Sequence, residues 1–354
     1  MRLCHNGDKM NRTAEVLFHM EMDVIGGGSI GLLFAAKLAL SGQKVNVWTR
    51  TERQAGEINS SGLTLIGESG PTASNIRVAS YPVRISGRDG VSSGEPRMAL
   101  LTVKQAAITE ELILFLGELL SHPGSVIICL QNGIGHLEKL EASLPHAEVL
   151  AAVTTEGARR INGCSVQHTG RGELWFGKAA PHGAENETGK GENVGMRPDN
   201  RHILFLDILN AAGFRSFLSN DMNNRIFQKL LINAVINPLT AIYDVRNGEL
   251  PEHPLRLRLM EALYEETAAL LMASGWKPQG DGWQNIMGVC RATAANVSSM
   301  LSDVRAGRPT EIEWINGGIV RLAERLGSKA PLNEALLAIV KKLLPDESGK
   351  RCEP

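Results

Sequence analysis

The sequence predicts an α/β domain built on a doubly wound parallel sheet, followed by an all-α domain. Short apolar segments alternate with helical patterns in the first half of the chain. A glycine-rich turn of the form G-x-G-x-x-G follows the first of these segments. Strand patterns stop near residue 220, where long amphipathic stretches begin. A chain of 354 residues also exceeds what one hydrophobic core normally serves.

The individual elements follow from apolar periodicity. Leu33, Ala36 and Leu40 recur at helical spacing, and Gly42 follows as a stop signal. We expect strands at 22–25, 44–48, 97–103 and 125–130, and helices at 32–41 and 108–120. This alternation favours a parallel sheet with crossover helices. In the second half we expect helices at 222–242, 253–274, 281–296 and 310–326.

Composition sets the expected domain boundaries. The α/β domain is placed at residues 20–219 and the helical domain at 220–345. Residues 1–19 lack periodicity and are expected to form a disordered extension, and residues 346–354 a frayed tail. Residues 181–199 are nearly free of apolar side chains, which predicts a flexible surface insertion.

Bulk composition excludes several classes of protein. The net charge of −1 gives no indication of nucleic-acid or membrane-surface binding. Apolar runs stay below the roughly 18 residues that a membrane span needs. The five cysteines are scattered without a C-x-x-C pair, and the nine histidines lack metal-ligand spacing. We therefore expect a cytoplasmic protein without a metal site, a membrane partner or a nucleic-acid partner.

The glycine turn predicts a Rossmann-type dinucleotide site. Its glycines permit a tight turn and close approach of a pyrophosphate to free amides at a helix N-terminus. The predicted cofactor residues here are Gly26, Gly27, Gly28, Ser29, Ile30 and Gly31. The second strand is followed by Arg50 rather than by a carboxylate, and a guanidinium suits the 2′-phosphate of NADPH. A glycine turn alone is weak evidence, and a solvated surface arginine is the alternative for Arg50.

A second motif opens the helical half. Lys229, Asn233 and Asn237 are spaced by four and form one polar stripe on a helix whose other positions are nearly all apolar. Such a stripe is costly to bury unless a partner or a ligand satisfies it. A third segment contains Ser299 and Glu311, for which helix capping and a site role both remain open.

These motifs together resemble the ketopantoate reductase (2-dehydropantoate 2-reductase) family of the 6-phosphogluconate-dehydrogenase-like superfamily. The similar segments span about residues 22 to 320, in the order IGGGSIG, LLTVKQ, LQNGIG, TEGARR, KLLINAVINPLTAIYDVRNGEL and SSMLSDVRAGRPTEIEWING. The last two are far more specific than the glycine turn. The polar insertion and the N-terminal extension depart from the family pattern without interrupting a motif.

The resemblance implies a role for each matching residue. Lys229 would be the general acid, and Glu311 would bind the cofactor ribose near the nicotinamide. The substrate's carboxylate and hydroxyl groups would be held by Asn233, Asn237, Asn247 and Ser299. Asn132 would contact both the nicotinamide and the substrate. Ala158 would offer a backbone contact, and Lys104 would lie beside the cofactor at the end of the fourth strand.

The resulting hypothesis is an NADPH-dependent reduction of ketopantoate to pantoate, in pantothenate and coenzyme A biosynthesis. The partner is then a small 2-keto acid, and the chain is a monomer or a homodimer. One alternative is a reductase of another 2-keto acid on the same scaffold, because fold does not fix substrate. A second is a non-catalytic NADPH-binding regulator, which would have no need of Lys229.

Overall fold

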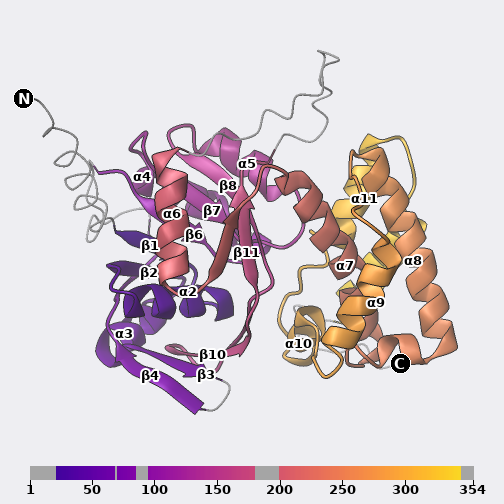
Figure 1. Ribbon diagram of the computed structural model, residues 1–354, viewed down its shortest axis with the longest axis horizontal. Helices are drawn as coiled ribbons and strands as arrows, with labels where there is room; N and C mark the ends of the chain where they lie inside the picture. Colours follow the sequence, from indigo (N-terminus) through magenta and orange to yellow (C-terminus); the bar gives the residue numbers. More distant parts are fainter. Residues whose placement is uncertain (1–20, 68–69, 85–94, 180–198, 344–354) are drawn as a thin grey trace, which may run out of the picture. The chain divides into compact units, whose positions relative to one another are not determined.

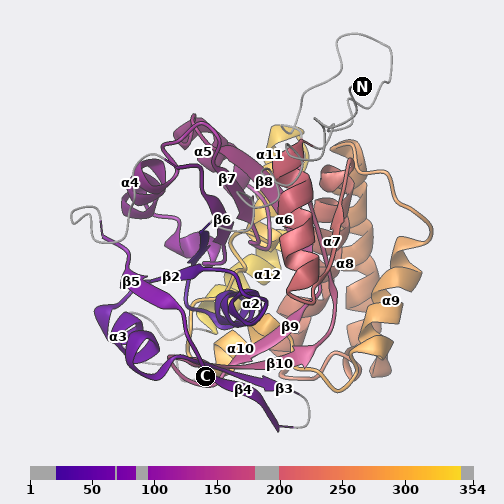
Figure 2. The ribbon, with the colours of Figure 1, turned by 60° about the vertical axis from the view of Figure 1, so that its left-hand side comes forward.

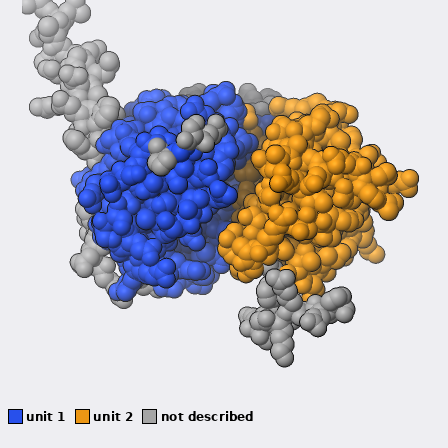
Figure 3. Space-filling model, turned by 90° about the horizontal axis from the view of Figure 1, so that it is seen from below, with its two compact units in different colours: residues 1–131, 136–179, 190–222 blue, residues 132–135, 180–189, 223–354 orange. Residues whose placement is uncertain are grey.

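The computed structural model describes residues 21–67, 70–84, 95–179 and 199–343. The predicted extension at 1–19 and tail at 346–354 lie outside these residues, as does the predicted insertion except for its last residue, Asp199. The chain divides into two compact units (Figure 3). Among the described residues, unit 1 runs to Met222 without the segment Asn132–Gly135. Unit 2 contains that segment and the residues from Asn223 onward.

An eight-stranded sheet forms the centre of unit 1, in the order β12-β11-β8-β7-β6-β1-β2-β5 (Figures 1 and 2). Its strands are β1 (Met22–Ile25), β2 (Val45–Thr49), β5 (Ala79–Pro82), β6 (Met98–Leu101), β7 (Val126–Cys129), β8 (Glu148–Thr154), β11 (Glu173–Gly177) and β12 (Arg215–Leu218). All neighbours are parallel except β8 and β11. The predicted doubly wound α/β sheet is thus confirmed, with one antiparallel pair.

The order of strands reverses at β1. The chain passes from β1 to β2 on one side and later returns to β6 on the other. Ile25 is in register with Trp48 of β2 and with Leu101 of β6, so the three strands end at the same edge. In open α/β sheets, ligands bind at such a switch point beyond the carboxyl ends of the strands.

Helices cover both faces of this sheet because side chains alternate along each strand. Met22 and Val24 pack with helices α2 (Ser29–Leu40) and α6 (Asn200–Ala211), whereas Ile25 packs with α4 (Glu110–Leu119) and α5 (His136–Ser143). The segment after β2 forms α3 (Glu52–Ser61), and the short 3-10 helix η1 (Gln105–Ala107) follows β6.

A second, four-stranded sheet packs on α2, in the order β4-β3-β10-β9. These strands are β3 (Leu63–Gly67), β4 (Gly70–Ile76), β9 (Gly157–Arg160) and β10 (Ser165–Gly170). The sequence prediction did not include this sheet. Its apolar residues Leu63, Leu65 and Val166 share the core of α2, so that the helix is covered on both sides.

One ion pair lies inside the large sheet. Asp23 is fully buried on β1 and accepts hydrogen bonds from the Trp48 indole at 2.7 Å and from the Asn46 amide at 3.2 Å. Arg97, which is 3% exposed, forms an ion pair with the other carboxylate oxygen of Asp23 at 2.6 Å. Burial raises the pKa of Asp23, and the positive charge of Arg97 opposes that rise.

The described part of unit 2 is helical, which confirms the predicted all-α half. It contains α7 (Met222–Tyr243), η2 (Leu250–Glu252), α8 (Pro254–Ala273), α9 (Gly282–Ala292), α10 (Ser299–Arg305), α11 (Asn316–Arg325) and α12 (Pro331–Lys342). The prediction of a helix from residue 310 was wrong at its start. Residues 311–315 form turns, in which the Trp314 and Ile315 amides both donate to the Glu311 carbonyl.

Helix α7 is the central helix of unit 2. By length and composition alone it resembles a membrane span, but 67% of its most apolar window is buried inside the structure. Leu230, Leu231, Val235 and Leu239 belong to one apolar cluster with residues of α8, α9, α11 and α12. This is the pattern of a core helix in a globular unit.

Candidate functional site

The glycine turn joins β1 to α2 in unit 1. Gly26 has a φ of +121°, a conformation that side chains other than glycine rarely adopt. A Cβ on Gly31 would lie 1.8 Å from the Gly26 carbonyl oxygen and 2.5 Å from Thr102 Oγ1. Only glycine therefore permits this close start of the helix against the sheet.

The turn has the features of an anion cradle. A Cβ on Gly28 would meet nothing within 4 Å, so the space in front of the turn is open among the described residues. Gly28 is the N-cap of α2 and offers no side-chain acceptor to the first amides of the helix. These amides also lack intrahelical partners. The residues present thus fit the pyrophosphate of a dinucleotide.

Two residues that support the turn were missed by the sequence analysis. The Gln54 amide donates to the Gly27 carbonyl at 2.8 Å and to the Gly163 carbonyl at 2.9 Å. Arg160 donates its backbone N–H to Ser29 Oγ at 3.0 Å and its guanidinium to the Gly27 carbonyl at 3.2 Å. The loop between β9 and β10 is therefore bonded to the predicted cofactor turn. Both contacts link residues far apart in sequence, and no local pattern indicates them.

The other predicted cofactor residues of unit 1 lie on neighbouring elements. Arg50 directly follows β2 and is exposed. Lys104 is partly buried and is the N-cap of η1, just beyond β6. These two residues follow strands whose ends share the edge that bears the glycine turn. Ala158 lies on β9, opposite His168 of β10.

Lys229, the predicted acid, lies in the first half of α7 in unit 2. Its side chain is partly buried, and burial lowers the pKa of the ammonium to about 8. The negative charge of Glu311 acts in the opposite direction and raises this pKa. A general acid works best when its pKa lies near the operating pH. A pKa of about 8 is consistent with the predicted role of Lys229 as a general acid.

Glu311 is fixed by Asn132. The Asn132 amide donates to Glu311 Oε2 at 2.8 Å, and the Glu311 residue is 9% exposed. Gly133 has a φ of +84°, and a Cβ there would lie 2.3 Å from the Trp314 carbonyl oxygen. The Ile134 amide donates to that carbonyl at 3.2 Å. The segment after β7 thus lies against the turn that bears Glu311, and unit 2 brings Asn132, Glu311 and Lys229 together.

The predicted substrate amides also lie in unit 2. Asn233 is partly buried on α7, and Asn237 is 8% exposed one turn later. Asn247, also 8% exposed, donates its amide to Thr293 Oγ1 at 2.9 Å. Its Oδ1 is buried without a hydrogen-bond partner among the described residues. An orphaned buried acceptor is costly, and a substrate hydroxyl would satisfy it.

Ser298, and not Ser299, is the residue that caps helix α10. Ser298 is the N-cap of α10 and accepts from the Leu301 amide at 3.1 Å, while Thr240 Oγ1 donates to it at 2.8 Å. Ser299 is exposed at the start of the helix. The structure therefore assigns the capping role to Ser298 and leaves the predicted substrate role of Ser299 as a prediction.

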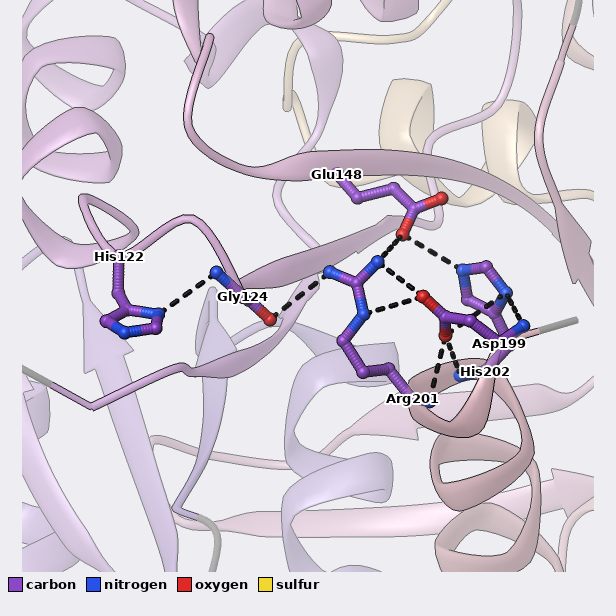
Figure 4. A network of polar contacts seen from close by, with 6 residues as sticks. All are labelled: His122, Gly124, Glu148, Asp199, Arg201 and His202. Carbon is purple, nitrogen blue, oxygen red and sulfur yellow. Dashed lines mark hydrogen bonds and ion pairs between the residues drawn. The ribbon is translucent and has the colours of Figure 1, made fainter.

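One group of potential metal ligands occurs among the described residues, formed by Glu148, Asp199 and His202 in unit 1 (Figure 4). The Arg201 guanidinium bonds to Glu148 at 2.9 Å and to Asp199 at 2.5 Å. Asp199 also caps α6 through the Arg201 and His202 amides. A cation already pairs with the two carboxylates, so the group is explained by helix capping and gives no argument for a metal.

Comparison with known proteins agrees with this arrangement. The family model described as "Ketopantoate reductase PanE/ApbA" matches residues 23–181, and the model "Ketopantoate reductase PanE/ApbA C terminal" matches residues 221–344. The 2-dehydropantoate 2-reductase of Bacillus subtilis (strain 168) is 32% identical over 92% of this chain and 97% of its own length. That of Vibrio cholerae serotype O1 is 30% identical over 92% of this chain and 98% of its own.

Solved structures show the same architecture. A probable 2-dehydropantoate 2-reductase from Bacillus subtilis has a TM-score of 0.71 at 28% identity, over 92% of this chain and all (100%) of that one. A D-mandelate dehydrogenase solved with NADH and anilino(oxo)acetate has a TM-score of 0.76 at 20% identity, over 92% and 98% of the two chains, and shows the fold alone. The matching family models, the relatives and the two-unit fold together show that the chain belongs to the ketopantoate reductase family of oxidoreductases.

Proposed function

We propose that the protein reduces ketopantoate to pantoate with NADPH, and that Lys229 is the general acid. The single observation that carries the proposal is that unit 2 holds together the half-buried Lys229, the Asn132–Glu311 pair and the amide stripe of α7. The lowered pKa of Lys229, at about 8, agrees with this grouping. The family membership supports the reaction class. The names of the relatives support the substrate, which serves pantothenate and coenzyme A biosynthesis.

Each residue then has a defined task. The amides of the glycine turn hold the pyrophosphate, Arg50 pairs with a 2′-phosphate, and Lys104 and Ala158 lie along the cofactor. When bound, the reduced nicotinamide supplies a hydride to the carbonyl carbon of the substrate. Lys229 Nζ gives its proton to the carbonyl oxygen and is reprotonated from solvent afterwards, so one hydride and one proton convert the ketone to the alcohol.

The remaining polar groups orient the two reactants. Glu311 accepts from the Asn132 amide and would also accept from a ribose hydroxyl, while Asn132 would contact both the nicotinamide and the substrate. Asn233, Asn237, Asn247 and Ser299 hold the carboxylate and hydroxyl groups of the 2-keto acid. Such fixed donors contribute to catalysis by positioning and by stabilising charge on the oxygen. We retain the expectation of a cytoplasmic enzyme, monomeric or dimeric.

The test is a spectrophotometric assay of NADPH consumption with ketopantoate, ketoisovalerate and pyruvate. We expect the highest kcat/KM for ketopantoate, and Lys229→Ala is expected to lower kcat by about two to four orders of magnitude. An unchanged kcat would remove Lys229 from the mechanism. A higher kcat/KM for another 2-keto acid would favour the first alternative. NADPH binding without turnover of any of the three would favour a regulator.

A further inference from the structure

The proline inside α7 leaves a backbone carbonyl without its helical partner. Pro238 follows Asn237 directly and lies in the interior of the helix. It has no N–H to donate to the carbonyl four residues earlier, which belongs to Ala234. Ala234 is fully buried, so water cannot replace the missing donor. An unpaired buried carbonyl would destabilise the helix at the position between Asn233 and Asn237.

A side chain from another helix supplies the donor. The Asn316 amide, at the first turn of α11, donates to the Ala234 carbonyl at 3.0 Å. Asn316 is itself fully buried. The bond joins residues 82 positions apart in the chain. We propose that Asn316 is a positioning residue for the substrate amides: by replacing the missing proline N–H, it sets the geometry of α7 across Asn233 and Asn237.

Asn316 is in turn held by a buried network. Its amide also donates to Asn333 Oδ1 at 2.9 Å. The Asn333 amide donates to Glu266 Oε1 at 2.9 Å and to Thr267 Oγ1 at 3.1 Å. Glu266 accepts as well from the Leu332 and Asn333 backbone amides at the start of α12. The Asn316 amide is therefore fixed from α8 and α12, which gives it one orientation toward α7.

The C-terminal half of the same helix has a similar support. Thr240 Oγ1 lies 2.9 Å from both the Ile236 and the Asn237 carbonyls and 2.8 Å from Ser298 Oγ. The residue before a proline is normally disfavoured in helical conformation. The two supports on either side of Pro238 thus maintain a helical Asn237 in a place where local preference opposes it.

The test is a double-mutant cycle with Asn316→Leu and Pro238→Ala. Alanine at position 238 restores an N–H that reaches the Ala234 carbonyl, so that the Asn316 donor becomes dispensable for this bond. The lost bond to Asn333 is common to both backgrounds and cancels in the cycle. Melting temperature and the KM for ketopantoate are measured for the four proteins, together with the pH dependence of kcat.

In the proline background, Asn316→Leu is expected to lower the melting temperature by roughly 5 °C and to raise KM about tenfold. The descending limb of kcat with pH should stay in place because Lys229 is unchanged. In the Pro238→Ala background, Asn316→Leu is expected to have a clearly smaller effect on both quantities. Equal effects in the two backgrounds would overturn the proposal, as would a fall in melting temperature without a change in KM.

The part of this inference that concerns substrate binding rests on the proposed function. The experiment nevertheless distinguishes a failure of the inference from a failure of the proposed function. Thermal melting needs no substrate, so coupling between Asn316 and Pro238 remains measurable if the wild-type protein does not reduce ketopantoate. Folding of the Asn316→Leu variant only in the Pro238→Ala background would also support the proposal. If Asn316→Leu folds in neither background, the cycle is repeated with Asn316→Asp, which preserves side-chain size, and additive effects there overturn the proposal.

Discussion

The pKa of Lys229 predicts how the reaction rate depends on pH. Burial lowers this pKa from 10.5 to about 8, and the acid must be protonated to act. About nine-tenths of the ammonium is then protonated near pH 7, and about one-tenth near pH 9. We therefore expect kcat/KM to fall roughly tenfold between these values. A lysine with the ordinary pKa of 10.5 would remain almost fully protonated over the same range.

The assay measures initial rates of NADPH consumption at low ketopantoate concentration in one mixed buffer of constant ionic strength. Lys229→Arg is the matched control, because a guanidinium stays protonated throughout and its residual activity should show no such fall. Glu311→Gln removes the charge that raises the pKa of Lys229, so the fall should move to lower pH. A rate that stays level to about pH 9, or an identical fall in Lys229→Arg, would refute the reasoning.

Three further predictions concern other parts of the molecule. In a Glu311→Gln background, where no buried carboxylate loses its cation, Lys229→Met is expected to raise the free energy of unfolding by about 1–3 kcal/mol near pH 7. A folded-state pKa of about 8 against 10.5 means that the charged form of Lys229 opposes folding below pH 8, and this effect disappears above about pH 10.5. Urea denaturation at two pH values measures the change, and a loss of stability would contradict the prediction. Arg50→Ala is expected to raise the KM for NADPH about tenfold or more while that for NADH changes little; equal changes for both cofactors would show that Arg50 does not bind the 2′-phosphate. Arg97→Met leaves Asp23 buried without its cation and is expected to lower the free energy of unfolding by about 3–5 kcal/mol. Adding Asp23→Asn to this variant should partly restore the lost stability. Additive losses for the two substitutions would argue against the ion pair.

The elements with clear periodicity were predictable from sequence. Strand β1 was predicted with its observed bounds, and α7 and α8 within one residue at each end, because apolar spacing fixes their buried faces. The small second sheet was not predictable in this way. Strands such as β9, with the sequence GARR, have no apolar alternation, and they form only because β10 and α2 provide partners.

The same division holds for the candidate site. The glycine turn and the stripe of Lys229, Asn233 and Asn237 follow local spacing, and the sequence indicates them directly. Gln54 and Arg160 bond to the turn across 27 and 133 positions. Their role depends on which backbone carbonyls the fold brings near them. Residue type and spacing in the sequence do not indicate which groups the fold brings close together.

The sequence pattern of helix α7 indicated a functional site because it contains residues that a buried helix normally excludes. A lysine, two asparagines and a proline all disfavour the interior of a buried helix. Other residues of unit 2 offset each of these conflicts. The charge of Glu311 stabilises the Lys229 ammonium, and Asn316 donates to the Ala234 carbonyl. The hydrogen bond between Thr240 and Ser298 supports the turn after Pro238. A helix maintained against its own propensities depends on the folded unit for its geometry. The ammonium and the amide stripe therefore take their arrangement only when the whole helical unit is assembled, which couples the stability of this unit to its chemistry.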